Sequence, residues 1–202
     1  EDLLDFYLND PNFKTDIVDD KYMNELFGQL YLLVFASINY AGRPELWDEI
    51  YEEQLKIHNE SDGILTMDDI QKMVKLDCFL RESFRYSADI DRDVFIMQKD
   101  TAFSNKFYGE TAHEFQPKRH IISHSNGKVV HSPATKVDRS LLTFGGGKHA
   151  CPGRFFAVNE IKMCLHKMIL KYHIRTESGK IDPIIVKSSM LLPPNSGLVL
   201  EN

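Results

Sequence analysis

The stretch that decides the fold reads Phe144-Gly145-Gly146-Gly147-Lys148-His149-Ala150-Cys151-Pro152-Gly153-Arg154-Phe155-Phe156-Ala157. It places a single cysteine, Cys151, behind a glycine-rich loop and in front of a predicted helix. Pro152 suits the first helical position, where no backbone donor is missed, so the Cys151 sulfur is expected at the helix N-terminus. The helix dipole and free N–H groups there stabilise a thiolate, which acts as a metal ligand or as a nucleophile.

The residues around Cys151 narrow the choice of partner. Three glycines remove side chains from one face of the loop, so a flat partner can approach the backbone. A phosphate-binding loop would need Ser or Thr after Lys148, where His149 stands, and a zinc site would need a second cysteine within a few residues. A lone thiolate suits a planar cofactor that brings its own donors, as haem does. The structural alternative is an inert buried cysteine in a glycine-rich turn.

The spacing of this loop matches a known pattern, F-x-x-G-x-[HR]-x-C-x-G, at Phe144, Gly147, His149, Cys151 and Gly153. The chain therefore resembles the cytochrome P450 superfamily, and residues 152–157 look like its fungal and other eukaryotic members. The resemblance implies that Cys151 ligates the iron of haem b (heme b, iron protoporphyrin IX), that His149 meets a haem propionate and that Phe144 shields the sulfur. It assigns cofactor binding to Phe144, Gly145, Gly147, His149, Cys151 and Gly153, and metal binding to Cys151.

A second motif lies upstream, in Leu80-Arg81-Glu82-Ser83-Phe84-Arg85. Glu82 and Arg85 are three residues apart, so they share a helical face and can pair. Such pairs also occur on many solvated helices. This pair is informative because it precedes the cysteine loop in the sequence. Between the two, Phe115-Gln116-Pro117-Lys118-Arg119-His120 resembles the family's F-x-P-x-R-[FWH] meander element. The resemblance implies that Arg119 joins Glu82 and Arg85 in a network that braces the loop.

Composition excludes several classes of protein. The net charge of -6, with no basic run, argues against a nucleic-acid surface. Three cysteines without a paired framework favour a reducing compartment. The longest apolar run, residues 30–38, is too short for a membrane span, and no signal peptide is recognisable. Because the chain starts at Glu1 rather than at a methionine, it is expected to be a piece of something longer.

The expected elements are mostly helical. Apolar residues over 21–40 predict a buried helix that Gly42-Arg43-Pro44 ends, and Pro44 begins a second helix to about residue 58. Thr66 and Asp69 resemble a capping box that opens the helix carrying Glu82. Residues 88–137 read as irregular, with a short strand at 91–95, and His120 with His124 favours a loop over a metal site. After Cys151, one apolar helix face is expected from Phe156, Ile161, Leu165, Met168, Ile169 and Tyr172.

The chain end predicts a β-hairpin in which residues 184–186 pair with residues 198–200. By resemblance, Met190, Leu191 and Leu192 are candidates for substrate contact, with plain hairpin packing as the alternative. The fold class is thus mainly α with small β elements. It is expected to be a single partial cytochrome P450 domain over residues 1–202, with I/J/K/L-type helices, a meander, a cysteine-ligand loop and a C-terminal β-hairpin.

The resemblance implies a haem-thiolate monooxygenase that inserts one oxygen atom of O2 into a hydrophobic organic substrate. Its electrons would come from NADPH, indirectly, through NADPH-cytochrome P450 reductase, or from a ferredoxin. The family's proton-delivery threonine is missing where Gly42-Arg43-Pro44 interrupts the central helix, so no catalytic residue is identified. By analogy the protein would sit at the cytosolic face of the endoplasmic reticulum membrane, although this chain holds no anchor.

Further gaps against the family pattern fall near residues 88–90 and 105–106. Together with the interruption at residues 41–44, they favour missing exons, a faulty gene model or a degraded gene over a minimal enzyme. The alternative to an active enzyme is a truncated, non-catalytic remnant that binds haem weakly or not at all. A third reading is a zinc or redox-thiol protein that uses Cys151 with Cys164 or His149.

Overall fold

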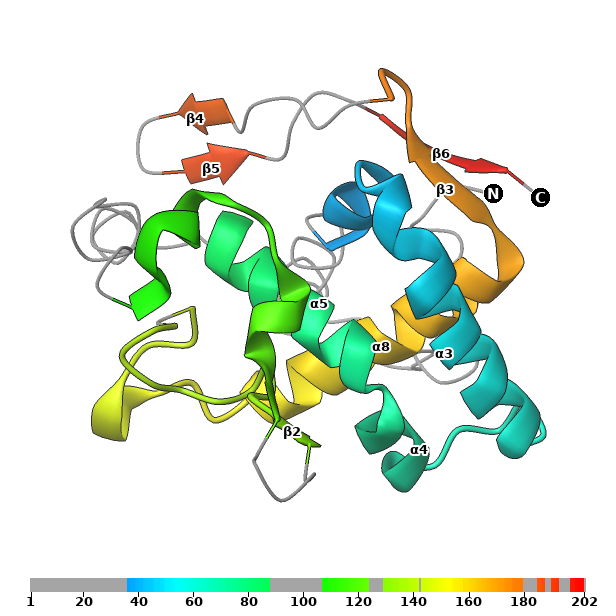
Figure 1. Cartoon of the computed structure of the whole chain (residues 1–202), viewed down its shortest axis with the longest axis horizontal. Coiled ribbons are helices and arrows are strands. Elements are labelled where there is room, and N and C mark those ends of the chain that lie inside the picture. Colours follow the sequence, from blue (N-terminus) through cyan, green and yellow to red (C-terminus); the bar gives the residue numbers. More distant parts are fainter. Residues whose placement is uncertain are drawn as a thin grey trace, which may run out of the picture.

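The computed structural model describes residues 36–87, 107–123, 129–141, 143–179, 185–187, 190–192 and 197–201, and these are mainly helical with small antiparallel strand pairs (Figure 1). This is the fold class expected from the sequence. The helices are α3 (Trp47–Glu60), α4 (Met67–Lys72), α5 (Val74–Ser87) and α8 (Arg154–Lys171), with 3-10 turns η1 (Pro44–Leu46), η2 (Gly109–His113), η3 (Pro117–His120) and η4 (Gly147–His149). The strands are β1 (Ile121–Ser123), β2 (Val129–His131), β3 (His173–Thr176), β4 (Ile185–Lys187), β5 (Met190–Leu192) and β6 (Leu198–Glu201).

The predicted break between the first two helices is confirmed, but Pro44 opens a 3-10 turn rather than the helix itself. A helix runs through residues 36–41 and stops before Pro44, which opens η1 and leads directly into α3. The rest of the expected helix over 21–40 lies outside the described residues. At the start of α4, the Thr66 hydroxyl accepts from the Asp69 amide and the Asp69 carboxylate accepts from the Thr66 amide at 3.0 Å. This reciprocal capping box satisfies two otherwise orphaned donors. The helix expected to run from the Thr66 capping box to Glu82 is divided at Met73, whose ψ of 65° is not helical, into α4 and α5.

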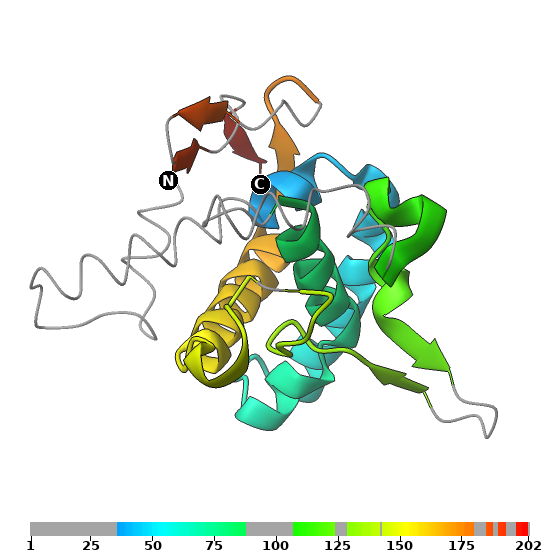
Figure 2. The same ribbon diagram turned by 90° about the vertical axis from the view of Figure 1, so that its left-hand side faces the viewer.

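The core lies where α5 and α8 meet, with α3 packed against both (Figure 1). α5 and α8 cross in the view of Figure 1 and appear as neighbours in the turned view of Figure 2. Fully buried side chains at this junction are Met73, Leu76, Phe79, Leu80, Ile161, Leu165 and Met168. The expected apolar face of α8 is confirmed except at Phe156, whose side chain is 61% exposed. Phe156 belongs to the first turn of α8, which projects beyond the packed part of the helix.

Buried charges tie the helices together as well. The Asp77 carboxylate of α5 lies 2.5 Å from Lys162 Nζ of α8, and it also receives hydrogen bonds from His131 and the Ala134 amide, each at 3.1 Å. Burial would raise the pKa of Asp77, but the His131 hydrogen bond and the Lys162 charge outweigh it and hold the pKa below its usual value. Asp77 is therefore charged at neutral pH, and removal of either partner would leave an uncompensated buried charge.

The strand pairs correct one expectation. A C-terminal β-hairpin is present, but it joins β4 to β5, with Ile185 opposite Leu192. Residues 198–200 belong to β6, which pairs with β3 in the register Ile174 to Leu200. The predicted pairing of 184–186 with 198–200 is therefore wrong. β4 pairs with β5, its neighbour in the chain, and β3, which follows α8 directly, takes β6 as its partner.

In the described part of the chain, no helix combines the length and the apolar character that crossing a bilayer requires.

The buried histidine His166 makes the stability of this core dependent on pH. Its Nδ1 lies 2.9 Å from Gln54 Oε1, and its ring centroid lies 5.8 Å from that of His58. Burial, then the charges of His58 and Lys167, lowers the pKa of His166 from 6.5 to about 4. Between these two pKa values the unfolded chain therefore binds more protons than the folded one. The contribution of neutral His166 to stability is complete above pH 6.5 and is lost as the pH falls toward 4.

We expect the free energy of unfolding to drop by roughly 2 kcal/mol through His166 alone between pH 6.5 and about pH 5. Urea denaturation followed by circular dichroism across this range measures the drop. The variant His166→Asn should flatten the profile, whereas His113→Asn, at an exposed site, should keep it. A wild-type profile that is flat over this range would contradict the expectation.

Candidate functional site

The loop that carries Cys151 is closed by its own backbone. The Cys151 amide donates to the Phe144 carbonyl at 2.8 Å, and η4 forms a single turn between them. Gly145 and Gly147 adopt φ of +75° and +58°, values in the left-handed region where other residues are strained. A Cβ added at Gly147 would meet nothing within 4 Å, so this side of the loop is open. The glycines thus allow the turn and keep one face of the loop free of side chains.

The start of α8 differs from the prediction. The helix begins at Arg154 with Gly153 as its N-cap, so the expectation that Pro152 holds the first helical position is wrong. Gly153 has ψ of -3°, a turn geometry, and Pro152 therefore lies in the connection between the loop and the helix. Cys151 precedes the N-cap by two residues, and its carbonyl accepts from Arg154 Nη1 at 2.7 Å.

The three cysteines differ sharply in their surroundings. Cys151 is exposed, whereas Cys78 and Cys164 are buried in α5 and α8. Burial, reinforced by the negative charge of Asp77, raises the pKa of Cys78 to about 12, so this thiol is inert. Only Cys151 among them is available to a partner.

Phe144 fixes the loop to the central helix. Its ring packs edge-on against Phe84 of α5, with centroids 5.6 Å apart and an interplanar angle of 86°. Phe84 is buried and lies between Glu82 and Arg85 in the sequence, so the helix turn that carries this charged pair also carries the contact to the cysteine loop. Lys148 and His149, by contrast, have exposed side chains on the open part of the loop.

Glu82 is the centre of a buried charged network. Its carboxylate binds Arg85 in a bidentate pair, at 2.8 Å to Nε and 2.7 Å to Nη2, and it lies 3.2 Å from Arg119 Nε. Burial would raise the pKa of Glu82, but the hydrogen bonds from Arg85 and His120 lower it to about 2. The structure therefore brings Glu82, Arg85 and Arg119 together around one fully charged carboxylate.

The two arginines use their remaining donors on the main chain of the meander. Arg85 donates to the carbonyls of Ala112 and Glu114, at 2.6 and 2.7 Å, and Arg119 donates to the Thr111 carbonyl at 2.7 Å. Residues 111–120 contain no regular helix or strand that would hold them by backbone pairing alone, apart from the two 3-10 turns. Arg85 thereby docks this segment on α5, and Arg119 ties the segment to Glu82 and to its own main chain.

Sequence reasoning missed two members of the network. His120 Nε2 lies 2.8 Å from Glu82 Oε2, and the Gln116 amide donates to Glu82 Oε1 at 2.8 Å. Burial lowers the pKa of His120 and the adjacent Glu82 opposes this only in part, so the ring is neutral at pH 7. The motif F-x-P-x-R-[FWH] could have pointed to His120, because its last position admits a side chain with a ring N–H donor.

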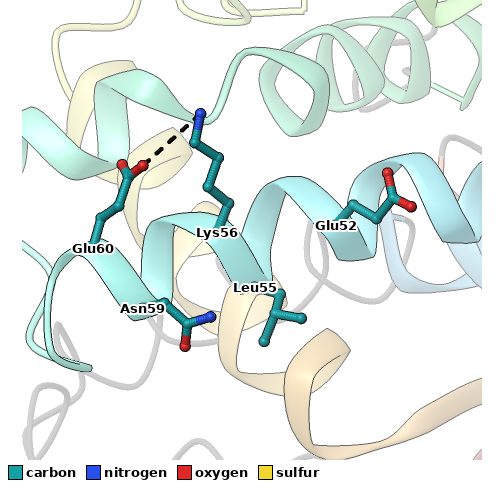
Figure 3. Close-up of a pocket in the computed structure, with 5 residues that line it drawn as sticks. All are labelled: Glu52, Leu55, Lys56, Asn59 and Glu60. Carbon is teal, nitrogen blue, oxygen red and sulfur yellow. Dashed lines mark ion pairs between the residues drawn. The ribbon is translucent and has the colours of Figure 1, made fainter.

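One surface hollow of the described residues lies away from this site. It lies on the outer face of α3 and is lined by Glu52, Leu55, Lys56, Asn59 and Glu60 (Figure 3). Lys56 Nζ lies 3.8 Å from Glu60 Oε1, and both side chains are exposed. Because one helix supplies every lining residue, the hollow is a groove between side chains on a solvated surface, and it presents no enclosed chemistry.

The donor set around Cys151 fits haem better than a bare metal ion. Within the described residues, no three His, Cys, Asp or Glu side chains gather to hold a metal, and Cys164 is buried inside α8. His124 lies outside them. A cofactor that brings its own equatorial donors needs only one thiolate from the protein. The exposed Cys151, the open glycine face and the aromatic support of Phe144 meet that requirement.

Comparison with known proteins shows the family to which the chain belongs. The family model described as Cytochrome P450 matches residues 91–200, which is more than half of the chain. The chain belongs to the cytochrome P450 family.

Several fungal proteins are among its relatives. The chain is 33% identical to Cytochrome P450 monooxygenase 71 of Postia placenta over 75% of its own length and 34% of that protein's length. It is 29% identical to Cytochrome P450 monooxygenase CYP512U6 of Ganoderma lucidum (83% and 37%) and 26% identical to Cytochrome P450 monooxygenase atmQ of Aspergillus flavus (88% and 39%). The chain thus spans little more than a third of the length of these relatives.

Proposed function

We propose that this chain forms the iron-ligand portion of a haem-thiolate monooxygenase, with Cys151 as the protein ligand of haem b. The observation that carries the proposal is the exposed Cys151 sulfur on a loop whose backbone is fixed on both sides of it. When bound, haem supplies oxygen activation and the insertion of one oxygen atom into an organic substrate.

The residues of the chain have the following parts in this proposal. Cys151 provides the thiolate, and the glycine face at Gly145, Gly147 and Gly153 lets the porphyrin approach the loop. Phe144, anchored on Phe84, shields the sulfur from water, and the exposed His149 meets a propionate. The network of Glu82, Arg85 and Arg119 holds the meander against the helix below the loop. We assign residues 1–202 to one partial domain of this kind.

The family supports three further proposals. Electrons reach the haem from NADPH through a reductase or from a ferredoxin, the substrate is a hydrophobic small molecule, and the full-length protein sits at the cytosolic face of the endoplasmic reticulum membrane. Fungal relatives named as cytochrome P450 monooxygenases support the first and the second of these proposals. Met190, Leu191 and Leu192 remain candidates for substrate contact.

A second candidate is a non-catalytic remnant that holds haem weakly. It is favoured by Phe155 and Phe156, which are 54% and 61% exposed in the turn of α8 next to Cys151. Large aromatic side chains at this exposure indicate a surface that lacks its cover. The two candidates predict different protection of the Cys151 thiol by haem.

Alkylation with iodoacetamide, followed by mass spectrometry, tests the proposal. Without haem we expect Cys151 to react at least about tenfold faster than Cys78 and Cys164, because it is exposed and the other two are buried. One equivalent of haem should slow Cys151 alkylation by at least about tenfold through ligation. Iron-free protoporphyrin is the matched control, since it covers the loop without a bond to sulfur. Equal labelling rates with and without haem favour the remnant.

A further inference from the structure

Another arginine of α5, Arg81, binds a segment other than the meander. Arg81 precedes Glu82 in α5, and its side chain is only 2% exposed. Its Nη1 donates to the carbonyls of Pro133 and Lys136, each at 3.0 Å, and its Nη2 lies 3.1 Å from Asp138 Oδ2 and 3.3 Å from Ser140 Oγ. Neighbouring residues on a helix point in different directions, so Glu82 holds the meander while Arg81 holds residues 133–140.

Residues 133–140 form a folded connector that leads straight into the cysteine loop. The Lys136 amide donates to the Pro133 carbonyl at 2.9 Å, and the Leu141 amide donates to the Asp138 carbonyl at 3.2 Å. Asp138 also accepts from the amide and the hydroxyl of Ser140, at 2.9 and 2.5 Å. Burial would raise the pKa of Asp138, but Ser140 and the Arg81 charge hold it below its usual value. The connector is therefore held by its own hydrogen bonds at the place where Arg81 binds it.

Arg154 joins the connector to Cys151. Its Nε donates to the Thr135 carbonyl at 3.0 Å, and its Nη1 donates to the Cys151 carbonyl at 2.7 Å. Thr135 lies between the two residues whose carbonyls bind Arg81. Two sets of hydrogen bonds, joined by the covalent backbone of residues 133–136, thus link α5 to the main chain of the cysteine.

With its amide bound to the Phe144 carbonyl and its own carbonyl bound to Arg154, Cys151 has both backbone groups fixed. The direction of the Cα–Cβ bond follows from the backbone, so the position of the sulfur depends on these two contacts. We propose that Arg81 and Arg154 form a brace, separate from the Glu82 network, that sets where the Cys151 sulfur points and makes both arginines positioning residues for haem ligation. The last part rests on the proposed function.

Hydrogen–deuterium exchange of the haem-free chain tests the brace without the cofactor. In Arg154→Gln we expect amides of residues 144–153 to exchange at least about tenfold faster, because the two charge-assisted hydrogen bonds of the guanidinium are lost. Arg81→Lys, which cannot reach all four acceptors, should act in the same direction. Arg139→Gln is the matched control, because it removes the same positive charge from an exposed position on the same connector. Amides of η3 should stay unchanged in Arg154→Gln.

A second measurement asks whether the brace acts on the ligand. The haem-loaded, reduced chain is exposed to carbon monoxide, and the intensity of the red-shifted Soret band typical of a thiolate is measured. In Arg154→Gln this intensity is expected to fall several-fold while the total haem content stays constant. Arg154→Lys should restore part of the intensity. Wild-type exchange in Arg154→Gln would overturn the brace, and faster exchange with an unchanged thiolate band would overturn its positioning role. Faster exchange in a chain whose wild type shows no red-shifted band would leave the brace standing and remove the haem proposal alone.

Discussion

Replacement of Glu82 by Gln is expected to destabilise the chain by about 3–5 kcal/mol, because it leaves buried arginines without their carboxylate. Glu82 is fully buried and is the shared partner of Arg85 and Arg119. An amide has the same size, yet it can neither neutralise two guanidinium groups nor accept on both atoms. A loss of this size is a large fraction of the 5–15 kcal/mol that holds a typical domain. Urea denaturation at neutral pH measures it.

The matched control is Glu110→Gln, at an exposed position in η2, which is expected to change stability by less than about 0.5 kcal/mol. The pH dependence offers a second check. Because the pKa of Glu82 falls from 4.5 to about 2 on folding, its contribution is complete above pH 4.5 and disappears as the pH approaches 2. A Glu82→Gln variant that unfolds at the wild-type urea concentration would show that the network contributes nothing to stability.

The second large effect concerns haem affinity. Replacement of Cys151 by Ala is expected to weaken haem binding by at least about a hundredfold, because even the loss of an outer partner of a metal ligand typically costs 10–100-fold. The side chain is exposed, so the substitution creates no cavity and stability should stay within about 0.5 kcal/mol of wild type. Titration with haem, followed in the Soret region, gives the affinity.

Cys164→Ala serves as the control for this titration. This substitution removes a thiol from a buried position on α8. It is expected to lower stability through a small cavity and to leave haem affinity unchanged. If Cys151→Ala and Cys164→Ala bind haem equally well, the iron is held by some other group or by hydrophobic contact alone.

The parts of the site that could be predicted are those with residue types at fixed local spacing. The Glu82–Arg85 pair follows from a three-residue step on a helix, and the Thr66–Asp69 capping box follows from the four-residue pattern of a helix start. The exposed loop at Cys151 follows from its glycines, two of which adopt positive φ. In each case the chemistry depends on residues close in sequence.

The parts that escaped prediction depend on distant backbone groups. Arg81 binds carbonyls 52 and 55 residues away, and any residue type at those positions would offer the same acceptor. The pairing of β6 with β3 depends on which edge is free after α8 is packed, and strand periodicity does not report this. Pro152 is compatible with the first turn of a helix and with a turn that precedes the helix. Because Gly153 is the N-cap of α8, Pro152 lies in the preceding turn.

The carbon monoxide difference spectrum of the reduced, haem-loaded chain tests the central claim most directly, since it reports the atom that binds the iron. The account predicts a Soret band shifted to the red by thiolate ligation, and its loss in Cys151→Ala. A folded wild-type chain that takes up haem but shows no such band, or a band that survives in Cys151→Ala, would contradict the claim that Cys151 is the haem ligand.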